Sequence, residues 1–184
     1  MTGIASKSQL RMSFLRYALL TVPGVLLLGT LSGRLSGSGY GNPWFDALVK
    51  PDFMPPGWTF GAAWTLLYIL LGLSLAMLLH ARGARGRTKA LILFVAQLVL
   101  NLAWSPIFFA MHEVAAALSV VAAMVVMTAV LIVLAWRIRP LAAALLIPYL
   151  GWLLFAAALN TEILRLNPDA AALAPRGSTT DIIL

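Results

Sequence analysis

The stretch Asn42–Tyr68, with the sequence NPWFDALVKPDFMPPGWTFGAAWTLLY, joins an irregular loop to the start of a very apolar segment. It contains three of the six tryptophans of the chain, together with four prolines and three phenylalanines. This composition favours a pocket for a flat, apolar ligand, because such pockets are lined mainly by apolar and aromatic groups. We therefore expect the stretch to form the lid and one wall of a ligand-binding site.

The overall composition predicts a membrane protein. Of the 184 residues, 61% are hydrophobic and only 10% are charged, whereas a soluble domain has about 25% charged residues. The net charge of +7 comes from basic residues in short loops between apolar segments, which favours membrane topology over nucleic-acid binding. The chain has no cysteine, which excludes disulfide bonds, thiolate nucleophiles and cysteine-bound metals.

Five long segments of the chain contain no Asp, Glu, Lys or Arg. A charged side chain at the centre of a transmembrane helix costs roughly 2.5–3.5 kcal/mol, so this partition indicates five membrane-spanning helices. The expected fold class is an all-α membrane protein, a single five-helix bundle over residues 17–166. The helices are expected at residues 17–35, 56–79, 89–111, 113–137 and 140–165.

The segments outside the bundle are short. Asn42 is a good N-cap and Pro43 a good first helical residue, which predicts a short helix over Pro43–Val49 in the first loop. The polar tail over residues 167–184 is expected to be disordered. Its sequence LAPRGS, Leu173–Ser178, resembles a protease site from an expression vector, so we expect part of the tail to be foreign to the natural protein.

The distribution of basic residues predicts the orientation in the membrane. Nine Lys and Arg residues lie at the end that holds the N-terminal segment 1–16, and four lie at the opposite end. Cytoplasmic loops carry the excess of basic residues. We therefore expect a multi-pass bacterial membrane protein with a cytoplasmic N-terminal segment, and with the first loop and the C-terminus on the periplasmic side.

Three of the apolar segments carry aromatic side chains at helical spacing, which places each set on one face. The amides of Gln97 and Asn101 share such a face and must point toward protein, because unpaired amides in hydrocarbon cost free energy. Rings from the first loop are expected to cap the pocket between these faces. The candidate ligand-binding residues are Trp44, Phe45, Phe53, Trp64, Tyr68, Gln97, Asn101, Trp104, Phe108, Trp152, Phe155 and Leu159.

Simpler interpretations of the same residues are open. Trp58 and Trp136 fit the belt of aromatic residues that forms at membrane interfaces. Deeper tryptophans such as Trp104 are also compatible with plain core packing, and Asn101 with a bridge between two helices. Alanines at seven-residue spacing, Ala96, Ala103 and Ala110, favour close helix packing or a dimer face over chemistry.

No arrangement of residues typical of catalysis is present in the sequence. All six carboxylates lie in predicted loops or tails, so no buried acid–base pair is expected within the helices. His80 and His112 belong to loops on opposite sides of the membrane and cannot share a metal. We expect no metal site and no required cofactor.

Several sequence pieces resemble the translocator protein/tryptophan-rich sensory protein family (TspO/MBR, peripheral benzodiazepine receptor). The resemblance covers roughly residues 17–167. It rests on Trp44-Phe45, Lys50-Pro51, PPGWTFGAAWTLLY at Pro55–Tyr68 followed by Gly72, NLAWSPIFF at Asn101–Phe109, Trp136, and PYLGWLLFAAALN at Pro148–Asn160.

The resemblance implies a five-helix bundle, usually a homodimer, that binds porphyrins, sterols and isoquinoline or benzodiazepine drugs. It places Trp64 and Trp152 in contact with the ligand, with Asn101, Trp104 and Phe155 nearby. In some bacterial relatives the two positions that match Trp64 and Trp152 are linked to light-dependent degradation of protoporphyrin, and both are tryptophan in this sequence.

The sequence departs from the animal pattern of the family at three places. The sterol motif keeps Arg165, but Thr161 stands where the motif needs an aromatic residue. Phe53 replaces a tryptophan that is common in the first loop of the animal proteins. The Gly-x-x-x-Gly motif of the dimer contact on the third helix is also absent, since Ile92 and Ala96 stand at the two glycine positions. High sterol affinity is therefore not expected.

Three functions follow from the sequence as hypotheses. The first is a membrane-embedded binding protein or sensor for porphyrins, protoporphyrin IX and haem, and other flat apolar ligands, which modulates tetrapyrrole transport or metabolism. The second is tryptophan-dependent photochemical degradation of the bound porphyrin, with Trp64 and Trp152 as the reactive residues. The third is a passive transporter of tetrapyrroles or sterols.

Overall fold

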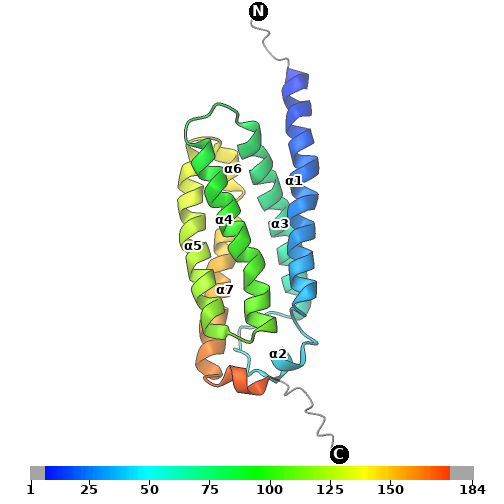
Figure 1. Cartoon of the computed structure of the whole chain (residues 1–184), viewed down its shortest axis with the longest axis vertical. Coiled ribbons are helices and arrows are strands. Elements are labelled where there is room, and N and C mark those ends of the chain that lie inside the picture. Colours follow the sequence, from blue (N-terminus) through cyan, green and yellow to red (C-terminus); the bar gives the residue numbers. More distant parts are fainter. Residues whose placement is uncertain (1–6, 175–184) are drawn as a thin grey trace, which may run out of the picture.

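The computed structural model describes residues 7–174, which form a bundle of long helices running side by side (Figure 1). The long helices are α1 (Lys7–Leu35), α3 (Gly57–His80), α4 (Arg87–Ser105), α5 (Val114–Trp136) and α7 (Ile147–Leu166). Five helical stretches are long and apolar enough to cross a membrane, and the described residues include no β-strand. The predicted all-α fold with five transmembrane helices is therefore confirmed.

The expected start of the first helix is wrong, whereas the fifth span has nearly the expected bounds, Pro140–Leu166, but is interrupted. Helix α1 begins at Lys7 and not at 17, because polar residues outside the hydrocarbon can extend a helix at no hydrophobic cost. The fifth span is not continuous: α6 (Pro140–Ala144) is followed by a turn and then by α7. Pro148 has no N–H and cannot donate to the carbonyl of Ala144, which breaks the helix at this point.

The third span changes its helical pitch near one end of the bundle. Helix α4 continues into η1 (Pro106–Ala110), a single wide π-helical turn in which the N–H of Met111 bonds to the carbonyl of Pro106 at 2.9 Å. Pro106 cannot donate in the α-helical register, so the turn widens. The wide turn buries both Phe108 and Phe109.

Helices α1 and α3 cross at glycines. A Cβ on Gly72 of α3 would lie 2.6 Å from the backbone Cα of Val22 in α1, and a Cβ on Gly29 of α1 would overlap the ring of Tyr68. The hydroxyl of Thr21 donates to the carbonyl of Gly72 at 2.7 Å. Small residues at this crossing bring the two backbones together, as is common in membrane helix pairs.

The first loop and the segment after α7 close one end of the bundle, where Figure 1 shows α2 beneath the helices. The short helix α2 spans Pro43–Ala47, two residues less than expected, and is capped by the side chain of Asn42.

The segment that follows α7 is ordered through η2 (Ala170–Leu173), so the prediction of a disordered tail from residue 167 is wrong. Its Ala170 carbonyl accepts a bond from Nε1 of Trp44 at 2.7 Å. The remaining tail, including most of LAPRGS, lies outside the described residues.

Candidate ligand-binding site

A cavity of about 520 Å³ lies between α1, α3, α4 with η1, α5 and α7, beneath the first loop. Nine of the twelve predicted ligand-binding residues line it. The structure thus brings together aromatic groups from four separate parts of the chain. The nine are Phe45, Trp64, Tyr68, Asn101, Trp104, Phe108, Trp152, Phe155 and Leu159.

The aromatic rings of the cavity wall contact one another in two groups. In the first, the ring of Trp152 lies 6.3 Å from that of Trp64 and 5.9 Å from that of Phe60, in both cases edge to face. In the second, Trp104 and Phe108 are stacked with ring centroids 5.0 Å apart and an interplanar angle of 16°. The wall therefore offers indole and phenyl faces on more than one side of the cavity.

The three other predicted residues do not line the cavity. Trp44 is only 1% exposed, and its ring packs edge-on against Phe108 at 5.4 Å, so it supports the cavity lining from behind. Phe53 is 50% exposed on the loop, with its ring 6.4 Å from that of Phe155. Gln97 lies one helical turn deeper than Asn101 and is fully buried in the core.

A chain of hydrogen bonds runs from the cavity into the bundle core. The hydroxyl of Tyr68 donates to Oδ1 of Asn101 at 3.2 Å, and Nδ2 of Asn101 donates to the hydroxyl of Tyr149 at 3.0 Å. The Tyr149 hydroxyl donates to Oε1 of Gln97 at 3.0 Å. Asn101 therefore both bridges helices and presents an amide to the cavity, so the two interpretations of this residue are compatible.

The sequence patterns missed the part of the lining that α1 supplies. Gly29, Thr30, Gly33 and Arg34 of α1 line the cavity, yet none belongs to an aromatic stripe. Phe60 of α3, on the same helical face as Trp64, also lines the cavity without having been predicted as a site residue. The four-residue spacing of Gly29 and Gly33 was the available signal on α1, since small residues on one helix face permit close approach of a neighbour.

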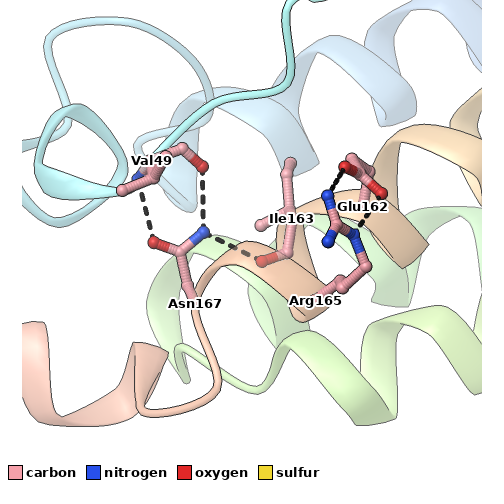
Figure 2. Close-up of polar contacts among 5 residues, drawn as sticks. All are labelled: Val49, Glu162, Ile163, Arg165 and Asn167. Atoms are coloured by element: carbon pink, nitrogen blue, oxygen red, sulfur yellow. Dashed lines mark hydrogen bonds and ion pairs between the residues drawn. The ribbon is translucent and has the colours of Figure 1, made fainter.

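The roof of the cavity is fastened by hydrogen bonds. The Lys50 ammonium donates to the backbone carbonyls of Phe45, Asp46 and Leu48 at 2.8 to 3.3 Å, which fixes the turn after α2. The Asn167 side chain then joins this loop to the end of α7. Its Oδ1 accepts from the N–H of Val49 at 2.8 Å, and its Nδ2 donates to the carbonyl of Val49 at 2.9 Å (Figure 2).

Arg165 and His112 do not line the cavity. Arg165, which the family resemblance assigns to a sterol motif, forms an exposed ion pair with Glu162, with Nε 2.9 Å from Oε2 (Figure 2). His112 has a backbone φ of 60° and its ring lies 4.6 Å from that of Trp44. Residues 7–174 contain no group of three His, Cys, Asp or Glu side chains arranged to hold a metal ion.

Comparison with known proteins identifies the family. The model of the TspO/MBR family matches residues 20–166. This chain belongs to the TspO/MBR family. It is 39% identical to the tryptophan-rich sensory protein of Cereibacter sphaeroides over 134 residues, which cover 71% of this chain and 83% of the relative. It is 38% identical to the translocator protein of Homo sapiens over 144 residues, 76% of this chain and 84% of the relative.

Another TspO/MBR relative comes from an archaeon. The chain is 40% identical to the tryptophan-rich protein TspO of Archaeoglobus fulgidus over 124 residues, which cover 67% of this chain and 80% of the relative. The family resemblance of the sequence is thereby confirmed, and the chain is a multi-pass membrane protein. Its orientation in the membrane stays a prediction.

Proposed function

We propose that this TspO/MBR protein binds porphyrins and other flat apolar ligands in its central cavity and acts as a sensor of tetrapyrroles in the membrane. One observation carries the proposal: the cavity of about 520 Å³ has walls of aromatic rings from α3, α4 with η1, and α7. Ligand pockets typically have volumes of roughly 300–1,000 Å³ and mostly apolar linings. The names of two relatives, a tryptophan-rich sensory protein and a translocator protein, support the same interpretation.

The wall suits a planar macrocycle with polar substituents. Rings such as Trp64 and Trp152 would stack on the faces and edges of the macrocycle. Asn101 uses one donor and one acceptor within the protein, which leaves it one further donor and one further acceptor position for a ligand. Arg34 lines the same cavity, and its guanidinium would pair with a ligand carboxylate. The site therefore combines stacking surfaces with two polar anchors.

We expect Trp152→Phe to weaken the binding of protoporphyrin IX by about tenfold, because the smaller ring loses stacking area and its contacts with Trp64 and Phe60. The measurement is the quenching of tryptophan fluorescence by protoporphyrin IX in detergent, fitted to a saturable binding curve. The matched control is Trp136→Phe. This is the same change at the last residue of α5, which is 55% exposed and does not line the cavity.

The control variant should retain the wild-type dissociation constant. Equal affinities for wild type, Trp152→Phe and Trp136→Phe would contradict the proposal that the aromatic cavity is the binding site. Quenching by protoporphyrin that does not saturate in the wild-type protein would contradict porphyrin binding itself.

A second candidate function is favoured by the contact between Trp64 and Trp152, which both line the cavity with ring centroids 6.3 Å apart. This function is light-dependent degradation of the bound porphyrin. An indole would give one electron to the photoexcited macrocycle, whose radical anion would add dioxygen from solution. The electron would then return to the indole radical cation, so that the net change is oxygenation of the macrocycle.

For this second function we expect illumination to bleach the porphyrin absorbance several-fold faster in the wild type than in a Trp64→Phe, Trp152→Phe double variant. Both samples must be saturated with porphyrin, so that occupancy does not differ. A sample without dioxygen is the control for the oxidant. Equal bleaching rates in the wild type and the double variant would exclude this function.

A further inference from the structure

A second hollow lies on the outside of the bundle, between α3 and α7. This groove has a volume of about 440 Å³ and is lined by apolar residues and one threonine. Thr59 and Ala63 form its α3 side, and Pro148 and Gly151 form its α7 side. Because α3 and α7 belong to membrane-spanning stretches, the groove faces the hydrocarbon of the bilayer.

The groove and the central cavity share a wall. Trp152 and Phe155 line both hollows, and no other residue does. Their two rings lie 5.4 Å apart, and Trp152 contacts Phe60 and Trp64 of α3 edge to face. The partition between the lipid-facing groove and the binding cavity is therefore built from aromatic side chains.

The partition contains no hydrogen bond between its two helices. Among the described residues, the side chains of α3 bond to α4 and α6, as Tyr68 does to Asn101 and Ser74 to the carbonyl of Ala142. The backbone of α3 accepts a bond from Thr21 of α1, and within residues 7–174 no hydrogen bond joins α3 to α7. The floor of the groove is also open, since a Cβ on Gly151 would meet no atom within 4 Å. Rotation of the rings would thus join the two hollows without breaking a hydrogen bond.

The roof of the cavity is held differently. Three hydrogen bonds tie the first loop to the segment at the end of α7: two between Asn167 and Val49, and one from Nε1 of Trp44 to the carbonyl of Ala170. Opening the roof would break these bonds, whereas opening the ring partition would break none. For an apolar molecule already dissolved in the bilayer, the lateral route therefore breaks fewer hydrogen bonds than the route through the roof.

We propose that the groove between α3 and α7 is a lateral portal, through which a flat apolar ligand passes from the lipid into the central cavity, with Trp152 and Phe155 as its gate. This inference rests on the proposed binding function. It adds a path and a source for the ligand, which is taken from the hydrocarbon phase and not from water beneath the loop.

The test fills the portal without touching the cavity. Gly151→Phe places a ring in the open groove, and Gly151 does not line the cavity. We expect the association and dissociation rates of protoporphyrin IX to fall together by about tenfold, with an unchanged dissociation constant, because only the barrier between the two states is raised. Stopped-flow quenching of tryptophan fluorescence in phosphatidylcholine nanodiscs gives the first rate. Transfer of porphyrin to an excess of empty vesicles gives the second.

Two further variants make the outcome decisive. Gly24→Phe is the matched control, since Gly24 of α1 also has open space around it and lines neither hollow, and its rates should equal those of the wild type. Thr59→Phe fills the groove from α3 and should repeat the effect of Gly151→Phe if that variant folds poorly.

Each result bears on one of the two proposals. Wild-type rates in both Gly151→Phe and Thr59→Phe would overturn the portal while leaving the binding function intact. A raised dissociation constant with an unchanged association rate would also overturn it, since the groove would then be part of the site. Absence of saturable binding in the wild type would instead refute the binding function, and the portal with it.

Discussion

Replacing Asn167 with alanine should loosen the attachment of the first loop to the end of α7. The side chain is buried, with 6% exposure, and its amide makes both hydrogen bonds to Val49 and a third to the carbonyl of Ile163 at 2.9 Å. Each hydrogen bond contributes roughly 0.5–1.5 kcal/mol net, so the loss should favour local opening by about 2 kcal/mol. The amide of Val49 should then exchange with deuterium roughly thirtyfold faster.

The control for this experiment lies two residues away. Figure 2 shows Arg165 and Glu162 on the last turns of α7, beside the Asn167 contacts. The Arg165 side chain is 68% exposed, and exposed ion pairs contribute only about 0–1 kcal/mol. Arg165→Ala should therefore leave exchange at Val49 almost unchanged. Equal exchange in the wild type and Asn167→Ala would contradict a clamp between the loop and α7.

The positions of the five spans could be predicted because the physical signal is strong. A charge in hydrocarbon is costly, so the absence of charged residues marks each span. The absence of charged residues does not predict where a helix begins outside the membrane, and α1 continues back to Lys7 through polar residues. It also does not predict a break within an apolar segment, such as the one before α7, which depends on the missing N–H of Pro148.

The site could be predicted where helical periodicity applied. Three- and four-residue spacing identifies the face that a residue shares, and this placed Trp64, Asn101 and Trp152 on the cavity. Periodicity does not say how deep a residue lies along that face. Gln97 shares the face of Asn101 but reaches Tyr149 in the core instead of the cavity.

Loop residues carry no periodic signal, so their positions could not be predicted in detail. Trp44 and Phe53 were both expected to cap the ligand, but Trp44 is buried behind the lining and Phe53 is half exposed. The position of Trp44 depends on a backbone carbonyl at Ala170, which is 126 residues away in the chain. No local pattern at Ala170 indicates this role, because the contact uses a group that every residue has.

Gly72→Val should destabilise the whole bundle, whereas Asn167→Ala loosens only its roof. The new Cβ would lie 2.6 Å from the Cα and 3.0 Å from the backbone N of Val22, and backbone atoms cannot rotate away as a side chain can. Helix α1 must therefore move. Overpacking costs about 1–3 kcal/mol, and loss of the Thr21 bond to the Gly72 carbonyl adds about 1 kcal/mol.

The consequence should reach the binding cavity, because α1 supplies Gly29, Thr30 and Gly33 to its wall. Among its described residues, Val25 is the only buried hydrophobic one on α1, so the helix has few other contacts to hold it in place. We expect thermal unfolding in detergent to shift down by about 5–10 °C and protoporphyrin binding to weaken. Gly24→Val, which introduces the same side chain into open space on α1, should change neither. An unfolding temperature for Gly72→Val equal to that of Gly24→Val would mean that α1 is held by something other than its close crossing with α3.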